Sequence, residues 1–274
     1  MRIASAGHAV FAATVIALGI LGLVQGNFAP IWEGVPGDFP TREGLVYLCA
    51  AVSLICGAGL FWQRSAGTAA RVLFAYLLLW MVLFKVPSIA RSPAVEGSYQ
   101  SCGETAVLVA GAWVLYAWFA GGWDQRQLGF AVGERGVRLA RVLYALALIA
   151  FGLSHFAYLN MTAPLIPGWL PGHVGWAYFT GCAYLAAAAA VLFGVYGRLA
   201  AGLSALQMGL FTVLVWVPPL VEGLMSTGQR GEFPVQSEFV LSWSLTAAAW
   251  VVVDSYRGDP WLRARPLLML RSSE

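Results

Sequence analysis

The chain repeats one sequence pattern, and this repetition limits the folds it can adopt more than any other feature. Pro36-Gly37-Asp38-Phe39-Pro40 recurs in the second half as Pro167-Gly168-Trp169-Leu170-Pro171. Further matches at the same spacing are Tyr47 with Tyr178 and Val86-Pro87 with Val217-Pro218. We call this constant spacing the repeat offset. A repeat at a fixed spacing indicates that one structural unit was duplicated, so we predict two similar halves.

Eight apolar runs divide the chain, four in each half. Charged residues make up only 11% of the sequence, against 59% hydrophobic ones, which is too little charge for a water-facing surface. A helix needs about 20 apolar residues to cross a bilayer, and its backbone groups must bond within it. We predict an all-α integral membrane protein whose eight transmembrane helices form two parallel-repeat four-helix bundles. The predicted spans are 8–26, 43–62, 70–88, 104–123, 138–159, 173–194, 198–219 and 237–254.

The distribution of arginine predicts the orientation of these spans. Twelve of the sixteen basic residues fall on the side that holds both termini, so the positive-inside rule places both termini in the cytoplasm. The first run matches one inside the chain, so we expect it to be retained and not cleaved as a signal peptide. The predicted domains are a first four-helix repeat (1–123), a cytoplasmic linker (124–137), a second four-helix repeat (138–254) and a cytoplasmic tail (255–274).

Polar and aromatic side chains gather near the predicted outer ends of the spans. Apolar walls with a few polar groups are typical of a ligand pocket. We expect Lys85 and Glu104 to pair, while the helix dipole favours a capping role for Glu104 and Glu238. Trp32, with Trp169, fits an outer aromatic belt. The candidate ligand-binding residues are His155, Trp169, Tyr178, His173, Gln25, Tyr47, Lys85 and Glu104.

Motifs for catalysis, metals and disulfides are missing from the sequence. It contains no G-x-S-x-G, H-E-x-x-H, P-loop or C-x-x-C-H pattern, so we predict no catalytic residue. His155 and His173 alone make a poor metal or haem site. The four cysteines show no paired spacing, and Cys102 is expected in a loop. The sequence contains no run of basic residues with interleaved aromatics, so we do not expect nucleic acid as a partner.

Three motifs in the second half follow one another in a recognisable order. They are G-x-x-H-F at residues 152–156, P-x-W-L-P at 167–171 and W-x-Y-x-x-G at 176–181. This order resembles the DoxX-like family of small four-helix membrane proteins, and the first half is similar in layout. Members of the family often carry an acidic residue near one position of the second helix. This chain has Tyr184 there, so the resemblance does not extend to any role of that acid. The whole chain would then be a tandem fusion of two such units.

The resemblance implies a set of functions that share redox chemistry. Relatives are associated with thiosulfate:quinone oxidoreductase subunits, methylamine-utilisation accessory proteins and oxidative-stress membrane complexes. We therefore predict a non-catalytic accessory subunit of a bacterial cytoplasmic (inner) membrane. It would bind a hydrophobic small molecule near the outer face, with quinone as the candidate, or dock a redox-complex partner protein.

Two alternatives remain open. One is a quinone-linked oxidoreductase membrane subunit, although no cofactor is evident in the sequence beyond the candidate quinone. The other is a small-molecule or lipid transporter, which the lack of ionisable residues near the predicted midplane disfavours. The expected partners are the lipid bilayer, redox-complex proteins and a second copy of the chain.

Overall fold

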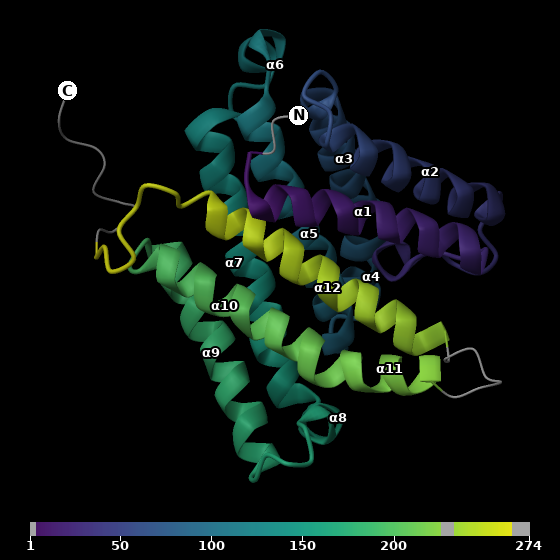
Figure 1. The fold of residues 1–274 in the computed structure, drawn as a ribbon, viewed down its shortest axis with the longest axis vertical. Coiled ribbons are helices and arrows are strands. Elements are labelled where there is room, and N and C mark those ends of the chain that lie inside the picture. Colours follow the sequence, from purple (N-terminus) through teal and green to yellow (C-terminus); the bar gives the residue numbers. More distant parts are fainter. Residues whose placement is uncertain (1–3, 226–232, 265–274) are drawn as a thin grey trace.

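The computed structural model describes residues 4–225 and 233–264, which are almost entirely helical (Figure 1). The only strand-like feature among them is an isolated bridge between Val195 and Ala264. The short helical segments are η1 (Pro30–Trp32), α4 (Val86–Arg91), α6 (Gly122–Gln127), α8 (Leu159–Thr162), η3 (Ala163–Leu165) and α11 (Val217–Met225). The long helices are α1 (Ala6–Gln25), α2 (Arg42–Leu60), α3 (Ala66–Trp80), α5 (Glu96–Phe119), α7 (Gly133–Ala157), α9 (His173–Phe193), α10 (Gly197–Phe211) and α12 (Phe233–Asp254).

Seven helical stretches in the described residues are long and apolar enough to cross a membrane. The eighth predicted span corresponds to α12, which has 22 residues but is not among these seven. It carries four hydroxyl side chains and two acids, which lower its hydropathy. The seven stretches are Ala6–Gln25, Arg42–Leu60, Ala66–Arg91, Glu96–Phe119, Gly133–Ala157, His173–Phe193 and Gly197–Gly223.

The third span of each half contains a π-helical turn, at η2 (Met81–Lys85) and at η4 (Thr212–Trp216). The bounds of these two turns differ by the repeat offset, as do those of α3 and α10. In η2 the Val86 N–H donates to the carbonyl of Met81, five residues back. A proline follows each turn and lacks the N–H that a regular helix would need, so the wider turn marks the place where the helical bonding is interrupted.

The long helices of each half pack in chain order (Figure 1). In the first half α1 packs on α2, α2 on α3 and α3 on α5; in the second α7 packs on α9, α9 on α10 and α10 on α12. The halves meet where α1 packs on α12, α5 packs on α7, and α5 crosses α12. The first helix of each half therefore lies against the last helix of the other. One continuous core results, to which both halves contribute.

The centre of this core is the crossing of α5 and α12. Residues 107–110 of α5 are fully buried, as are residues 247–249 of α12. At the crossing, a Cβ added to Gly111 would lie 3.0 Å from both Cα and Cβ of Ala248. Carbon atoms attract one another best at about 3.5–4.0 Å. A side chain at position 111 would therefore force the helices apart, and glycine permits their close approach.

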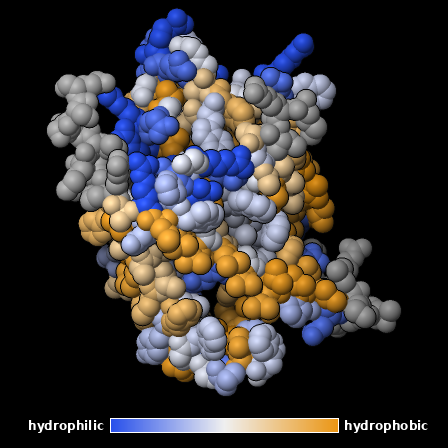
Figure 2. Space-filling model, turned by 60° about the vertical axis from the view of Figure 1, so that its left-hand side comes forward, coloured by the Kyte–Doolittle hydropathy of each residue, from blue (hydrophilic) through white to orange (hydrophobic). Residues whose placement is uncertain are grey.

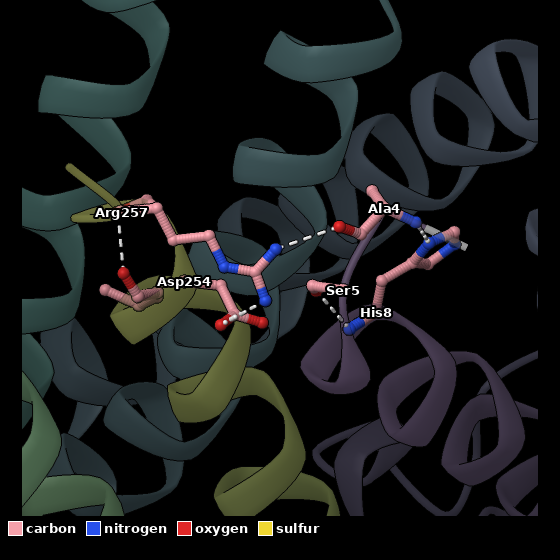
Figure 3. A network of polar contacts seen from close by, with 7 residues as sticks. Ala4, Ser5, His8, Asp254 and Arg257 are labelled. Carbon is pink, nitrogen blue, oxygen red and sulfur yellow. Dashed lines mark hydrogen bonds and ion pairs between the residues drawn. The ribbon is translucent and has the colours of Figure 1, made fainter. Parts of the chain in front are cut away.

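The start of α1 is tied to the end of α12 (Figure 3). Arg257 donates from Nη1 to the Ala4 carbonyl at 2.9 Å and from Nη2 to Asp254 Oδ1 at 3.0 Å. Ser5 caps α1 by accepting the His8 N–H at 2.9 Å. His8 Nδ1 accepts the Ala4 N–H, so its Nε2 carries the ring proton. We call the end of the molecule that contains these contacts the terminal end, and the opposite end the distal end.

Helix α6 is held at the terminal end by the carboxylate of Asp124. Oδ1 accepts hydrogen bonds from the Tyr116 hydroxyl at 2.9 Å and from Arg71 Nη1 at 3.1 Å, and Oδ2 accepts the Gly121 N–H at 3.0 Å. Burial alone would raise the pKa of Asp124, but these three donors stabilise the charged form more strongly. The pKa of Asp124 is therefore lowered below its ordinary value.

The surface separates into polar and apolar zones. On the face shown in Figure 2, hydrophilic residues gather towards the upper part and apolar residues lie below them. Exposed apolar side chains occur along most of the long helices, including Ile55 of α2, Leu146 of α7 and Leu203 of α10. Apolar patches of this extent are typical of a surface that contacts lipid or protein.

Candidate functional site

The most unusual polar residue is Lys85, at the end of the π-helical turn η2. Only 3% of its surface is exposed, and Nζ donates a 2.8 Å hydrogen bond to Ser101 Oγ of α5. The loop after η1 covers its aliphatic stem. At Gly34 in this loop, where φ is +102°, a Cβ would lie 3.7 Å from Lys85 Cδ. An ammonium inside a membrane-spanning stretch is costly, so its retention marks a candidate functional group.

Two acidic side chains at the distal end, Glu104 of α5 and Glu33 of the loop after η1, interact electrostatically with Lys85. Glu104, which is half-buried, also interacts with Glu33 and with Glu238 of α12. We call these four residues with Ser101 the distal polar cluster. It contains one basic and three acidic side chains, of which Glu33 and Glu238 are exposed.

Two further hydrogen bonds lie beside the cluster. Gln25, the last residue of α1, donates from Nε2 to Ser237 Oγ of α12 at 2.9 Å. Within α5, Gln100 donates weakly to Glu104 Oε1 at 3.4 Å. Residues from both halves thus contribute to one polar region, because α1 and α5 belong to the first half and α12 to the second.

Two expectations for this region are wrong. Glu104 and Glu238 do not cap their helices, because α5 begins at Glu96 and α12 at Phe233, more than a turn earlier in each case. Cys102 lies within α5 and not in a loop. The expected interaction of Lys85 with Glu104 is present as an electrostatic one, while the direct hydrogen-bond partner of Lys85 among the described residues is Ser101. All four cysteines are free thiols in the structure.

The candidates in the second half are not gathered into one site. His155 Nδ1 lies 2.7 Å from the carbonyl of Phe151, which can only accept, so Nδ1 carries the proton and Nε2 is left as an acceptor. The ring of His155 lies 5.6 Å from the ring of Tyr184. The Tyr178 ring instead contacts Phe156, with 5.8 Å between the ring centroids.

The remaining candidates lie on the surface. Trp169 is 71% exposed, Tyr47 is exposed on α2, and His173 is the first residue of α9. Near His173 the surface forms an open depression of about 310 Å³. Its lining residues are Gly172, Gly175, Trp176 and Phe179.

The first half contains an aromatic cluster around Trp32, formed with Tyr76 and Trp80, that the sequence did not predict; we call it the aromatic plug. Trp32 is only 1% exposed, so its assignment to the outer aromatic belt is wrong. Its indole N–H donates to Ser53 Oγ at 3.2 Å, and its ring meets those of Tyr76 and Trp80 edge-on, each at 5.3 Å. The repeat offset makes Tyr184 the equivalent of Ser53 in the second half. The two halves are therefore filled differently at equivalent places.

Hydroxyl groups supply the polar contacts deeper in the second half. Thr212 Oγ1 lies 2.7 Å from Ser242 Oγ and 3.3 Å from Thr246 Oγ1, and Tyr144 bonds to Ser204 at 2.8 Å. Such hydrogen bonds between apolar helices are commonly structural. Among the described residues, no group of three or more His, Cys, Asp or Glu side chains could hold a metal ion.

The distal polar cluster is therefore the best candidate site. Lys85 can donate to a carbonyl or phenolate oxygen, and the carboxylates can accept from a hydroxyl group. Sequence reasoning found Lys85, Glu104 and Gln25 but missed Ser101, Ser237 and Glu33. The first two missed residues are serines inside helices, where they are common, and the place of Glu33 depends on how its loop folds back over Lys85.

One family model matches part of the chain. It describes a domain of unknown function, DUF8561, and covers residues 144–253, from within α7 to the penultimate residue of α12. Neither a curated protein nor a solved structure matches the chain.

Proposed function

We propose that the protein is a DoxX-like tandem repeat with eight spans in a bacterial cytoplasmic (inner) membrane, and that its terminal end faces the cytoplasm. The matching bounds of α3 and α10 and of the two π-helical turns support the repeat. The last long helices of the two halves, α5 and α12, also share an A-x-A-W-V segment, although these segments are spaced more widely than the repeat offset. They meet at the α5/α12 crossing through Gly111 and Ala248, as similar segments do near a pseudo-two-fold axis. The eighth span in this arrangement is α12.

Within that membrane the protein would act as a non-catalytic accessory subunit. It binds a hydrophobic small molecule whose polar head enters the distal polar cluster. Among ligand classes, a quinone is the preferred candidate. The buried ammonium of Lys85, held between α5 and a loop that lies over it, is the observation that carries this proposal. It offers a donor for a ring carbonyl, and Glu104 offers an acceptor for the hydroxyl of the reduced form.

The same surface suits the docking of a redox partner. Glu33 and Glu238 are exposed acidic side chains at the edge of the cluster. A partner with a basic patch would be attracted there, mainly through its association rate. Small-molecule binding and docking are compatible, because the exposed acidic side chains and the buried Lys85 are different groups.

Binding of a short-chain quinone to the protein in nanodiscs tests the proposal, with tryptophan quenching as the readout. Lys85→Met keeps the length of the side chain and removes the donor. We expect saturable binding to the unchanged chain and an affinity about tenfold weaker for the variant, the effect of one charge-assisted hydrogen bond. Arg91→Met, an exposed cation at the end of α4, is the matched control and should bind normally.

Two results would refute quinone binding at the distal polar cluster. One is the absence of saturable binding of quinone or quinol, and the other is equal affinity for Lys85→Met and the unchanged chain. An absorption spectrum of the purified protein separates the accessory role from the oxidoreductase alternative. Haem or flavin bands that remain with the protein would favour the enzyme. Flux of a quinone analogue across proteoliposomes would favour the transporter.

A further inference from the structure

A narrow groove of about 160 Å³ lies at the terminal end, between α3, α5 and the loop that follows α6. We call it the α3/α5 groove. Apart from Arg71, every residue that lines it is apolar or aromatic. The lining includes Phe74 and Ala75 of α3, Trp113 and Tyr116 of α5, and Phe130 of the loop.

The walls of the groove are fixed by contacts that do not depend on an occupant. The Phe74 ring stacks on Tyr116 at 5.6 Å and lies 4.9 Å from Trp113. The indole N–H of Trp113 donates to the carbonyl of Ala131 at 2.8 Å and so holds the loop beside α5. Phe130, next to this anchored carbonyl, is 63% exposed. The groove is thus preformed and apolar, and one of its edges is open.

Arg71 lies at the mouth of the groove with part of its guanidinium free. Nη1 pairs with Asp124 at 3.1 Å, and the guanidinium carbon lies 5.5 Å from the ring centre of Trp123. The side chain is still 39% exposed. A guanidinium has five N–H donors, so the pairing with Asp124 fixes one edge and leaves donors for an acceptor outside.

The corresponding place in the second half is occupied differently in the described residues. The repeat offset makes Gly202 the equivalent of Arg71, and a Cβ there would lie 3.0 Å from the ring of Trp261. Trp261 in turn stacks under Arg198, at 4.3 Å from the guanidinium carbon. This indole covers the surface of α10 at Gly202 and Arg198. The opening in the first half is therefore not a general consequence of the repeat.

We propose that the α3/α5 groove holds one acyl chain of an anionic phospholipid from the cytoplasmic leaflet, with its phosphate at Arg71. The apolar walls suit a hydrocarbon chain, and the free guanidinium donors suit phosphate oxygens. Twelve of the sixteen basic residues fall on the side of the predicted topology that includes Arg71. That excess of positive charge favours a headgroup with net negative charge over a zwitterionic one.

Native mass spectrometry of the full chain tests this, after reconstitution in phosphatidylcholine with or without phosphatidylglycerol. We expect one tightly held phosphatidylglycerol per chain. Arg71→Gln removes the phosphate partner, and Ala75→Phe fills the groove while the pair of Arg71 and Asp124 stays intact. Each variant should lower lipid occupancy about tenfold, the loss expected for one strong interaction. Arg64→Gln, an exposed arginine at the same end that does not line the groove, should retain the lipid.

The outcomes separate cleanly. Loss of the lipid in both groove variants, with retention in Arg64→Gln, supports the proposal. Equal retention in all chains, or loss in Arg64→Gln as well, means that the lipid is held by general surface charge and overturns it. Equal binding of phosphatidylcholine and phosphatidylglycerol overturns the headgroup assignment. None of these readouts depends on the distal polar cluster, so the result is independent of the proposed quinone site.

Discussion

The crossing of α5 and α12 offers a direct test of how the two halves are joined. Gly111 and Ala248 face each other there, and a Cβ at position 111 would lie 3.0 Å from Cα and Cβ of Ala248 and 3.2 Å from its carbonyl oxygen. Gly111→Ala adds one methyl group at this point. Ala248→Gly removes the methyl group opposite. Combining the two exchanges the residues across the crossing.

The expected magnitudes follow from these distances. The added methyl group is about 0.5–1 Å too close to its neighbours, and overpacking of this kind costs about 1–3 kcal/mol. The higher helix propensity of alanine returns about 1 kcal/mol, so the net cost of Gly111→Ala is about 0–2 kcal/mol. Ala248→Gly loses a buried methyl group and helix propensity, together about 2 kcal/mol.

The exchange should cost less than the sum of the single changes. Replacing Ala248 removes the opposing Cβ, but its Cα still lies 3.0 Å from the new methyl group. Relief is therefore partial, and we expect a coupling free energy of about 1 kcal/mol.

Unfolding in mixed micelles with increasing SDS, followed by circular dichroism, measures the four free energies of this cycle. Gly44→Ala in α2 is the control, because a Cβ there meets nothing within 4 Å and should cause no loss of stability. A coupling free energy below about 0.5 kcal/mol is the usual result for independent sites. That result, with a Gly111→Ala chain as stable as the original, would refute close packing of α5 on α12.

Three further predictions concern other parts of the structure. Trp32→Ala should lower the free energy of unfolding by about 3–5 kcal/mol, whereas Trp32→Phe should cost only about 1 kcal/mol for the lost hydrogen bond to Ser53. Equal losses in melting temperature for the two variants would contradict the role of the Trp32 ring in filling this core. Because the folded pKa of Asp124 lies below its unfolded value of about 3.9, its contribution is present above that pH and is lost as the pH falls through the folded pKa. The stability advantage over Asp124→Asn should therefore shrink as melting is measured from about pH 5 towards pH 2, and a constant difference would exclude this linkage. Reporter fusions after residue 130 and at the C-terminus should both report the cytoplasm, and a periplasmic signal from either would overturn the eight-span topology.

The positions of the helices could be read from the sequence with small errors. Predicted runs 173–194 and 8–26 correspond to α9 (His173–Phe193) and α1 (Ala6–Gln25). The signal is strong because about 20 consecutive apolar residues leave few alternatives to a helix. The largest error was the start of α5, predicted at residue 104 but observed at Glu96. The first two turns of that helix contain Glu96, Ser98 and Gln100, so composition alone did not distinguish them from a loop.

The candidate site was predicted only in part. Gln25, Lys85 and Glu104 were selected because they are polar groups in apolar surroundings. In the structure Glu104 interacts electrostatically with Lys85, and Gln25 bonds to Ser237 of α12. Their actual partners, Ser237 and Ser101, give no such signal. The burial of Trp32 also had no signal, because an aromatic residue in a loop near a span fits an interfacial belt equally well.

The sequence by itself determined the apolar helices and their approximate bounds, because hydrophobic length acts locally along the chain. Only the tertiary structure decided how the halves share a core. The contact between Gly111 and Ala248 depends on two helices from opposite halves of the chain approaching within a methyl group of each other. The same is true of Lys85, which becomes a buried basic side chain beside Glu104 and Glu33 only when a loop, a π-helical turn and α5 converge. Convergence of this kind is set by side-chain packing between distant segments, which no local pattern encodes.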